Sequence, residues 1–65
     1  MKITVNGEDR VTGARTLADL CDELGLSAAK IATARNGEFV PAARRLEIVL
    51  AEGDAIELLS PRQGG

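Results

Sequence analysis

Apolar and polar residues alternate at the start of this 65-residue chain. In residues 2–5, Ile3 and Val5 occupy alternate positions, which is the period of a strand with one buried face. The pair Asn6-Gly7 follows and is a strong hairpin signal, because both residues tolerate a positive φ angle. A second strand is therefore expected near residues 9–12.

The register of this hairpin depends on where Val11 points. A strict two-residue turn places Val11 opposite Lys2, on the polar face of the sheet. One extra loop residue or a bulge would place Val11 on the apolar face with Ile3 and Val5. We expect such an irregularity.

Residues 17–24 have the period of an amphipathic helix, with one apolar stripe at positions i, i+3, i+4 and i+7: Leu17, Leu20, Cys21 and Leu24. Thr16, with Asp19 three residues later, resembles a capping box, and Gly25 is a suitable C-cap. Because Cys21 lies on the stripe, we expect a small buried core residue and not a reactive thiol.

Further apolar segments follow the helix. Residues 31–35 predict a third strand, which a second Asn-Gly pair closes at Asn36-Gly37. Phe39 then begins a short return strand, and Pro41 ends it, as is typical of the edge of a sheet. In residues 46–50 the alternation is interrupted, so the face of this segment stays open.

Residues 55–59 predict the last strand of the chain. Ile56 and Leu58 share one face of it, which we assign to the core, so Leu59 is expected to point outward. Pro61 ends this strand because it has no N–H group to donate.

The predicted order is a hairpin, a helix, two short strands and a last strand. One helix covers only one face of such a sheet, and a mixed sheet with its first and last strands parallel and central satisfies most of the backbone. We therefore predict an α+β fold of the ubiquitin-like β-grasp type, with four to five strands and one main helix packed on one face. The domain is expected to span residues 1–60, followed by a flexible tail, residues 61–65.

Composition and charge narrow the function. The hydrophobic fraction of 45% is typical of a globular chain, and the net charge of -2 argues against nucleic acid as a main partner. No apolar stretch approaches the length of a membrane span, and the first residues lack the apolar region of a signal peptide. We expect a cytoplasmic protein with no membrane partner.

The side-chain inventory excludes most catalytic chemistry. With no histidine and a single cysteine, the chain offers neither a zinc site nor a Cys–His nucleophile. Ser27 and Ser60 have no histidine to activate them. We expect no enzyme activity, no metal and no cofactor bound by this chain.

The last residues carry the candidate chemistry. Five extended residues reach about 16–18 Å, and Gly64 and Gly65 have no Cβ, so the backbone can pass through a narrow channel. A carboxylate becomes a useful acyl donor only after activation, typically as an acyl-adenylate. Arg62 and Gln63 either orient this tail in a polar groove or only keep it solvated.

Five short motifs follow one another along the chain: Ile3-x-Val5-Asn6-Gly7, Thr16-Leu17-x-x-Leu20, Asn36-Gly37-x-x-Val40-Pro41, Leu50-x-x-Gly53-Asp54-x-Ile56-Glu57-Leu58 and Gln63-Gly64-Gly65. In this order and spacing they resemble the small sulfur carrier of thiazole synthesis in bacterial thiamine pathways. The resemblance covers essentially the whole chain.

The resemblance implies a carrier that other enzymes act on. In that family an activating enzyme adenylates the terminal glycine with ATP and magnesium, and the glycine then becomes a thiocarboxylate that donates sulfur to thiazole synthase. Carried over, Gly65 bears the sulfur and Gly64 gives access to it. The implied partners are an adenylating enzyme of the ubiquitin-activating type, a sulfur donor such as a cysteine desulfurase or a rhodanese-like protein, and thiazole synthase. Arg62 departs from the pattern, which has an aliphatic residue at this position.

The expected docking segment is Leu58 and Leu59, with the outward Leu59 as an anchor for the activating enzyme. Three other functions stay open. The molybdopterin-pathway carrier has the same fold and chemistry, although its members are usually longer and more aromatic before the glycines. A ubiquitin-like modifier would join Gly65 to lysines. A non-covalent β-grasp interaction module would bind equally well without Gly64 and Gly65.

Overall fold

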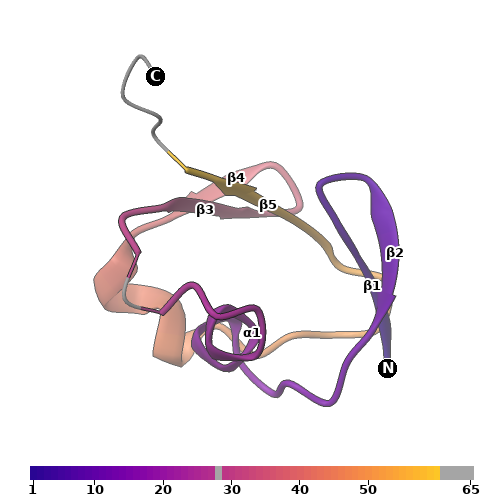
Figure 1. Cartoon of the computed structure of the whole chain (residues 1–65). Helices are drawn as coiled ribbons and strands as arrows, with labels where there is room; N and C mark the ends of the chain where they lie inside the picture. The colour runs from indigo at the N-terminus through magenta and orange to yellow at the C-terminus, as the bar shows by residue number, and fades with distance from the viewer. Residues whose placement is uncertain (28, 61–65) are drawn as a thin grey trace.

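The computed structural model describes residues 1–27 and 29–60, and Figure 1 shows how their elements are arranged. The elements in chain order are β1 (Lys2–Val5), β2 (Glu8–Val11), α1 (Leu17–Glu23), β3 (Ala32–Arg35), β4 (Glu38–Val40), the 3-10 helix η1 (Ala42–Glu47) and β5 (Ala55–Leu59). None of the helices in these residues has the length and apolar character that crossing a membrane requires.

The strands form one mixed sheet in the order β2-β1-β5-β3-β4. The strands β1 and β5 are parallel, and the other neighbouring pairs are antiparallel. The helix α1 lies across one face of this sheet (Figure 1). The five-stranded sheet with one main helix confirms the predicted β-grasp fold.

The first hairpin corrects the expected register. Val5 pairs with Glu8 and Lys2 pairs with Val11, so Asn6 and Gly7 form a strict two-residue turn with φ angles of 52° and 85°. The expected extra residue or bulge is wrong, and the side chain of Val11 is 78% exposed.

A polar contact explains why β2 needs no apolar residue on its inner face. Arg10 lies opposite Ile3, on the side of the sheet that faces α1. Its Nε donates a 2.9 Å hydrogen bond to Glu23 at the end of that helix, and the Thr12 hydroxyl donates one of 2.6 Å to the same carboxylate. A network of charged and polar groups therefore closes this edge of the core.

The ends of α1 follow the predicted signals. The Thr16 hydroxyl accepts from the Asp19 N–H, and the Asp19 side chain accepts from the Thr16 N–H, which completes a capping box. Leu24 is the C-cap residue, and Gly25 follows with a φ of 74°. The N–H of Leu26 then donates to the carbonyl of Cys21 at 2.8 Å, as in a Schellman motif.

The core lies between α1 and the sheet. Its buried hydrophobic residues are Ile3, Ala14, Leu17, Leu20, Cys21, Val40, Leu50, Ile56 and Leu58. The prediction that Cys21 is a buried core residue is confirmed, and burial raises the pKa of its thiol. A thiol held neutral in this way is a poor nucleophile.

Residues 46–50, whose buried face the sequence did not predict, run beside the residues that lead into α1 and do not form a regular strand. Leu46 is exposed at the end of η1, whereas Leu50 is buried. The N–H of Leu17 donates to the Ile48 carbonyl, and the Leu50 N–H donates to the Arg15 carbonyl, both at 2.9 Å. These bonds fix the segment to the chain that enters the helix.

Candidate functional site

The candidate site begins where β5 ends. This strand lies in the centre of the sheet, between β1 and β3, and leads to the predicted tail. Four of the predicted site residues, Arg62, Gln63, Gly64 and Gly65, lie outside the described residues, as does the predicted domain boundary after residue 60. The described part of the site is therefore the end of β5 and the surface around it.

The two leucines of the predicted docking segment differ in position. Burial alternates along β5, so Ile56 and Leu58 face the core and Leu59 points away from it. Leu58 is 8% exposed, whereas Leu59 is 68% exposed. Of this pair, Leu59 alone offers its side chain to a partner, and Leu58 contributes to packing.

A shallow apolar hollow lies beside Leu59 on the face of the sheet opposite α1. Ala32 pairs with Leu59, and Ala34 pairs with both Glu57 and Phe39, so two small residues form its floor. The larger side chains of Phe39, Leu59 and the charged Glu57 line it, and its volume is about 90 Å³. We call this feature the outer hollow.

Phe39 is the site residue that the sequence reasoning did not assign. It lies on the edge strand β4 and is 69% exposed. The sequence contained a signal that could have identified Phe39, because it is the only aromatic residue of the chain and lies in a segment predicted to be an edge strand. One exposed apolar side chain is ordinary, but Phe39 lies across the outer hollow from the exposed Leu59, and neighbouring exposed apolar residues mark a candidate binding surface.

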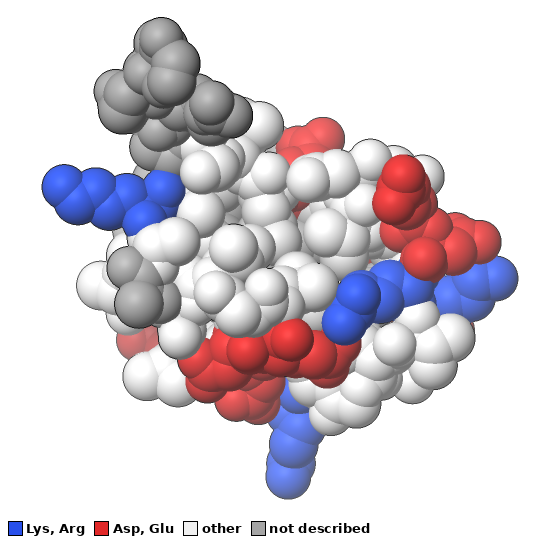
Figure 2. All heavy atoms as spheres, viewed as in Figure 1, with Lys and Arg blue, Asp and Glu red and all other residues white. Residues whose placement is uncertain are grey.

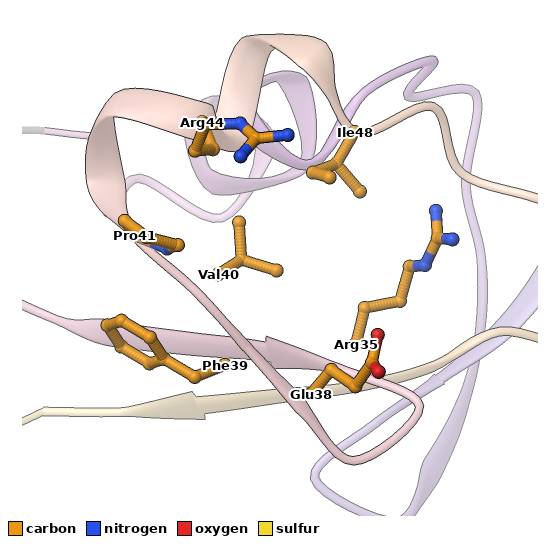
Figure 3. Close-up of a pocket in the computed structure, with 7 residues that line it drawn as sticks. All are labelled: Arg35, Glu38, Phe39, Val40, Pro41, Arg44 and Ile48. Atoms are coloured by element: carbon orange, nitrogen blue, oxygen red, sulfur yellow. The ribbon is translucent and has the colours of Figure 1, made fainter.

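A second hollow lies on the other side of Phe39, between the β3–β4 hairpin and η1 (Figure 3). Its volume is about 190 Å³, and Arg35 and Arg44 extend over a floor that includes Val40. Arg35 donates a 2.9 Å hydrogen bond to the Val49 carbonyl, and its Nε lies 3.9 Å from Asp54. Arg44 pairs with Glu47 at 2.9 Å. Because both cations have partners, this cleft is not a strong anion site.

Charge is unevenly distributed over the surface. Figure 2 shows acidic side chains gathered over α1, whereas the surface between that helix and the end of β5 is uncharged. The helix contributes Asp19, Asp22 and Glu23. The neutral surface in this view borders the end of β5 on the α1 side, whereas the exposed Glu57 lines the outer hollow on the opposite face of the sheet.

Comparison with known proteins identifies the family. The model of the ThiS family matches residues 3–65. The chain belongs to the ThiS family. The resemblance to the sulfur carriers of thiamine biosynthesis is thereby confirmed.

Individual relatives agree with the family match. The crystal structure of the thiamine biosynthesis protein ThiS from Geobacter metallireducens is 29% identical, covers the whole of both chains and superposes with a TM-score of 0.82. The solution structure of a thiamine biosynthesis protein from the same organism is also 29% identical, with a TM-score of 0.80, and covers 100% of this chain and 88% of that one. A thiazole synthase from Paramagnetospirillum magneticum is 35% identical over 66 residues. This chain spans 20% of that protein's length.

Proposed function

We propose that this ThiS-family chain carries sulfur as a thiocarboxylate on Gly65 and delivers it to thiazole synthase. The observation that carries the proposal is the family match, which runs through the sequence Gln63-Gly64-Gly65 to the last residue. The supporting structural observation is that the central strand β5 ends at Leu59, from which the sequence continues to these residues. The other carboxyl groups among the described residues belong to Asp and Glu side chains of the folded domain, which cannot reach a remote active site as an extended terminus can.

The proposed chemistry has two steps at the Gly65 carboxyl group. A carboxylate oxygen attacks the α-phosphorus of ATP in the activating enzyme, and pyrophosphate leaves with magnesium as its counter-ion. A donor that supplies sulfur at the oxidation level of sulfide then attacks the acyl carbon, and AMP leaves. The carboxylate has lost one oxygen to AMP and gained one sulfur. Gly64 and Gly65 let the backbone enter both active sites because they have no side chains.

Thiazole synthase is the proposed acceptor of the sulfur. The supporting observation is that a protein named thiazole synthase contains a segment 35% identical to this chain. A carrier segment and its acceptor within one chain meet at a high effective concentration. This observation favours the thiamine pathway over the molybdopterin pathway for this chain.

The outer hollow is the proposed docking surface for the activating enzyme. Leu59 is exposed, is the last residue of β5, and borders the hollow together with Phe39. An aliphatic or aromatic side chain of the partner that fills the hollow would remove both large residues from water. The body of the carrier would then hold its terminus at the active site.

The reaction itself tests the proposal. The native chain is incubated with its activating enzyme, MgATP and a sulfur donor, and its intact mass is then measured. We expect one oxygen to be replaced by sulfur in the native chain. A chain without Gly65 and a chain with one added alanine should stay unmodified although folded. A native chain that binds the enzyme but gains no sulfur would contradict the proposal.

A further inference from the structure

The end of β5 extends beyond its ladder with β1. The parallel pairing of these strands covers Thr4 with Ala55 and Val5 with Ile56, and there β1 ends. The N–H group of Asn6 continues the ladder by donating to the Ile56 carbonyl at 2.9 Å. Further along β5, the backbone of Leu58 therefore has no β1 main chain beside it.

The side chain of Asn6 takes the place of that missing main chain. Its Oδ1 accepts a 2.9 Å hydrogen bond from the Leu58 N–H, and its Nδ2 donates to the Leu58 carbonyl at 3.2 Å. A side-chain amide offers both an N–H donor and a carbonyl acceptor, as a peptide group does. Asn6 thus adds one residue to the ladder with its side chain.

The second Asn-Gly turn holds the other end of the same strand. The N–H of Asn36 donates to the Ala55 carbonyl at 2.7 Å, and the Ala55 N–H donates to Asn36 Oδ1 at 2.9 Å. Asn36 Nδ2 also donates to Asp54 at 3.1 Å. Asn36 therefore fixes the start of β5, and Asn6 fixes its end.

The turns alone do not require these side chains. Asn6 and Asn36 have φ angles of 52° and 50°, a conformation that glycine adopts at least as readily. A glycine in either position would keep the two-residue turn. Asn6→Gly would lose the two side-chain bonds to Leu58, and Asn36→Gly would lose those to Ala55 and Asp54. The side-chain amide is thus explained by β5 and not by the turn.

We propose that Asn6 is a positioning residue for the transfer reaction, an inference that rests on the proposed function. By holding Leu58, it fixes the point from which Leu59 meets the partner and from which the chain continues to Gly65. Without Asn6, Leu58 and Leu59 would be held on one side only, by their pairing with β3. Fewer molecules would then present Leu59 and the terminus together, and the apparent affinity for the activating enzyme would fall with that fraction.

The test compares Asn6→Gly with Asn36→Gly, its matched control at the other end of β5. Hydrogen exchange of single amides is measured by NMR, and KM and kcat of adenylation are measured with the cognate activating enzyme. Asn6→Gly should speed exchange of the Leu58 amide by about tenfold, the factor for one lost hydrogen bond. Asn36→Gly should speed exchange at Ala55 instead.

Kinetics separates positioning from stability. Asn6→Gly should raise KM by about threefold or more with kcat little changed, since the variant reacts normally once it is bound. Asn36→Gly, with a similar loss of thermal stability, should keep the native KM. Equal KM values for the two variants, or native exchange at Leu58 in Asn6→Gly, would overturn the inference while the native chain is still adenylated. A native chain that is not adenylated would instead overturn the proposed function.

Discussion

Glu23, at the end of α1, binds two residues at the edge of the sheet, Arg10 of β2 and Thr12 just after it. Its carboxylate accepts hydrogen bonds from Thr12 and Arg10 and forms an ion pair with Arg10 at 2.7 Å. The bond from the Thr12 hydroxyl is the main reason that the pKa of Glu23 is lowered, and the bond from Arg10 adds to it. The folded state therefore favours the ionised form of Glu23.

This network predicts a pH dependence of stability. Because the folded pKa of Glu23 lies below its unfolded value, the stabilisation is complete above that unfolded value, near pH 4.5, and is lost as the pH falls through the folded pKa. Glu23→Gln should thus be less stable than the native chain at pH 7, and the difference should shrink below pH 4. Urea denaturation at both pH values measures it. Glu47→Gln, which removes an exposed ion pair with Arg44, is the control and should change stability little. A difference for Glu23→Gln that is independent of pH would contradict the assignment.

At the residue scale, the sequence predicted burial correctly where it follows the two-residue period of a strand. The alternation along β5 gave the buried Leu58 and the exposed Leu59 correctly. Alternation did not predict Val11, because its inner neighbour Arg10 finds a partner on α1 that is distant in sequence. The amide of Asn6 was missed for the same reason, since Leu58 lies 52 residues away.

At the scale of the elements, local signals decided most of the fold. The capping box, the Asn-Gly turns and Pro41 fixed where α1, β3 and β4 begin or end, and the structure agrees with each to within about two residues. The sequence pattern did not predict which face of residues 46–50 is buried, because their hydrogen-bond partners, Arg15 and Leu17, lie where the chain enters α1. A period in the sequence cannot reveal that contact.

If the activating enzyme docks at the outer hollow, a change of Leu59 should weaken its binding. Leu59→Asp places a charge beside the outer hollow and should weaken binding of the activating enzyme by about tenfold or more, because a buried leucine contributes roughly 1.5–3 kcal/mol. Val11→Asp is the matched control, since Val11 is also largely exposed on the same face of the sheet but lies on the far edge strand β2. Calorimetric titration measures both affinities, and circular dichroism checks the fold. Equal affinities for the two variants would contradict docking at the outer hollow.

At the scale of the whole molecule, the central strand β5 is the last described element before the residues for which we propose the chemistry. The strand β5 has neighbours on both sides and contributes Ile56 and Leu58 to the core. Both turn asparagines bind it as well. A rigid body that ends at Leu59 can dock first and then deliver a terminus that has no side chains at its last two positions.

The intact mass of the protein recovered from its own cells tests the central claim most directly. We expect a fraction of the chain, from cells that are making thiamine, to have one oxygen replaced by sulfur, and fragmentation to locate the change at Gly65. Sulfur on Cys21, Gly65 joined to lysines of other proteins, or only the free carboxylate in such cells would contradict the account.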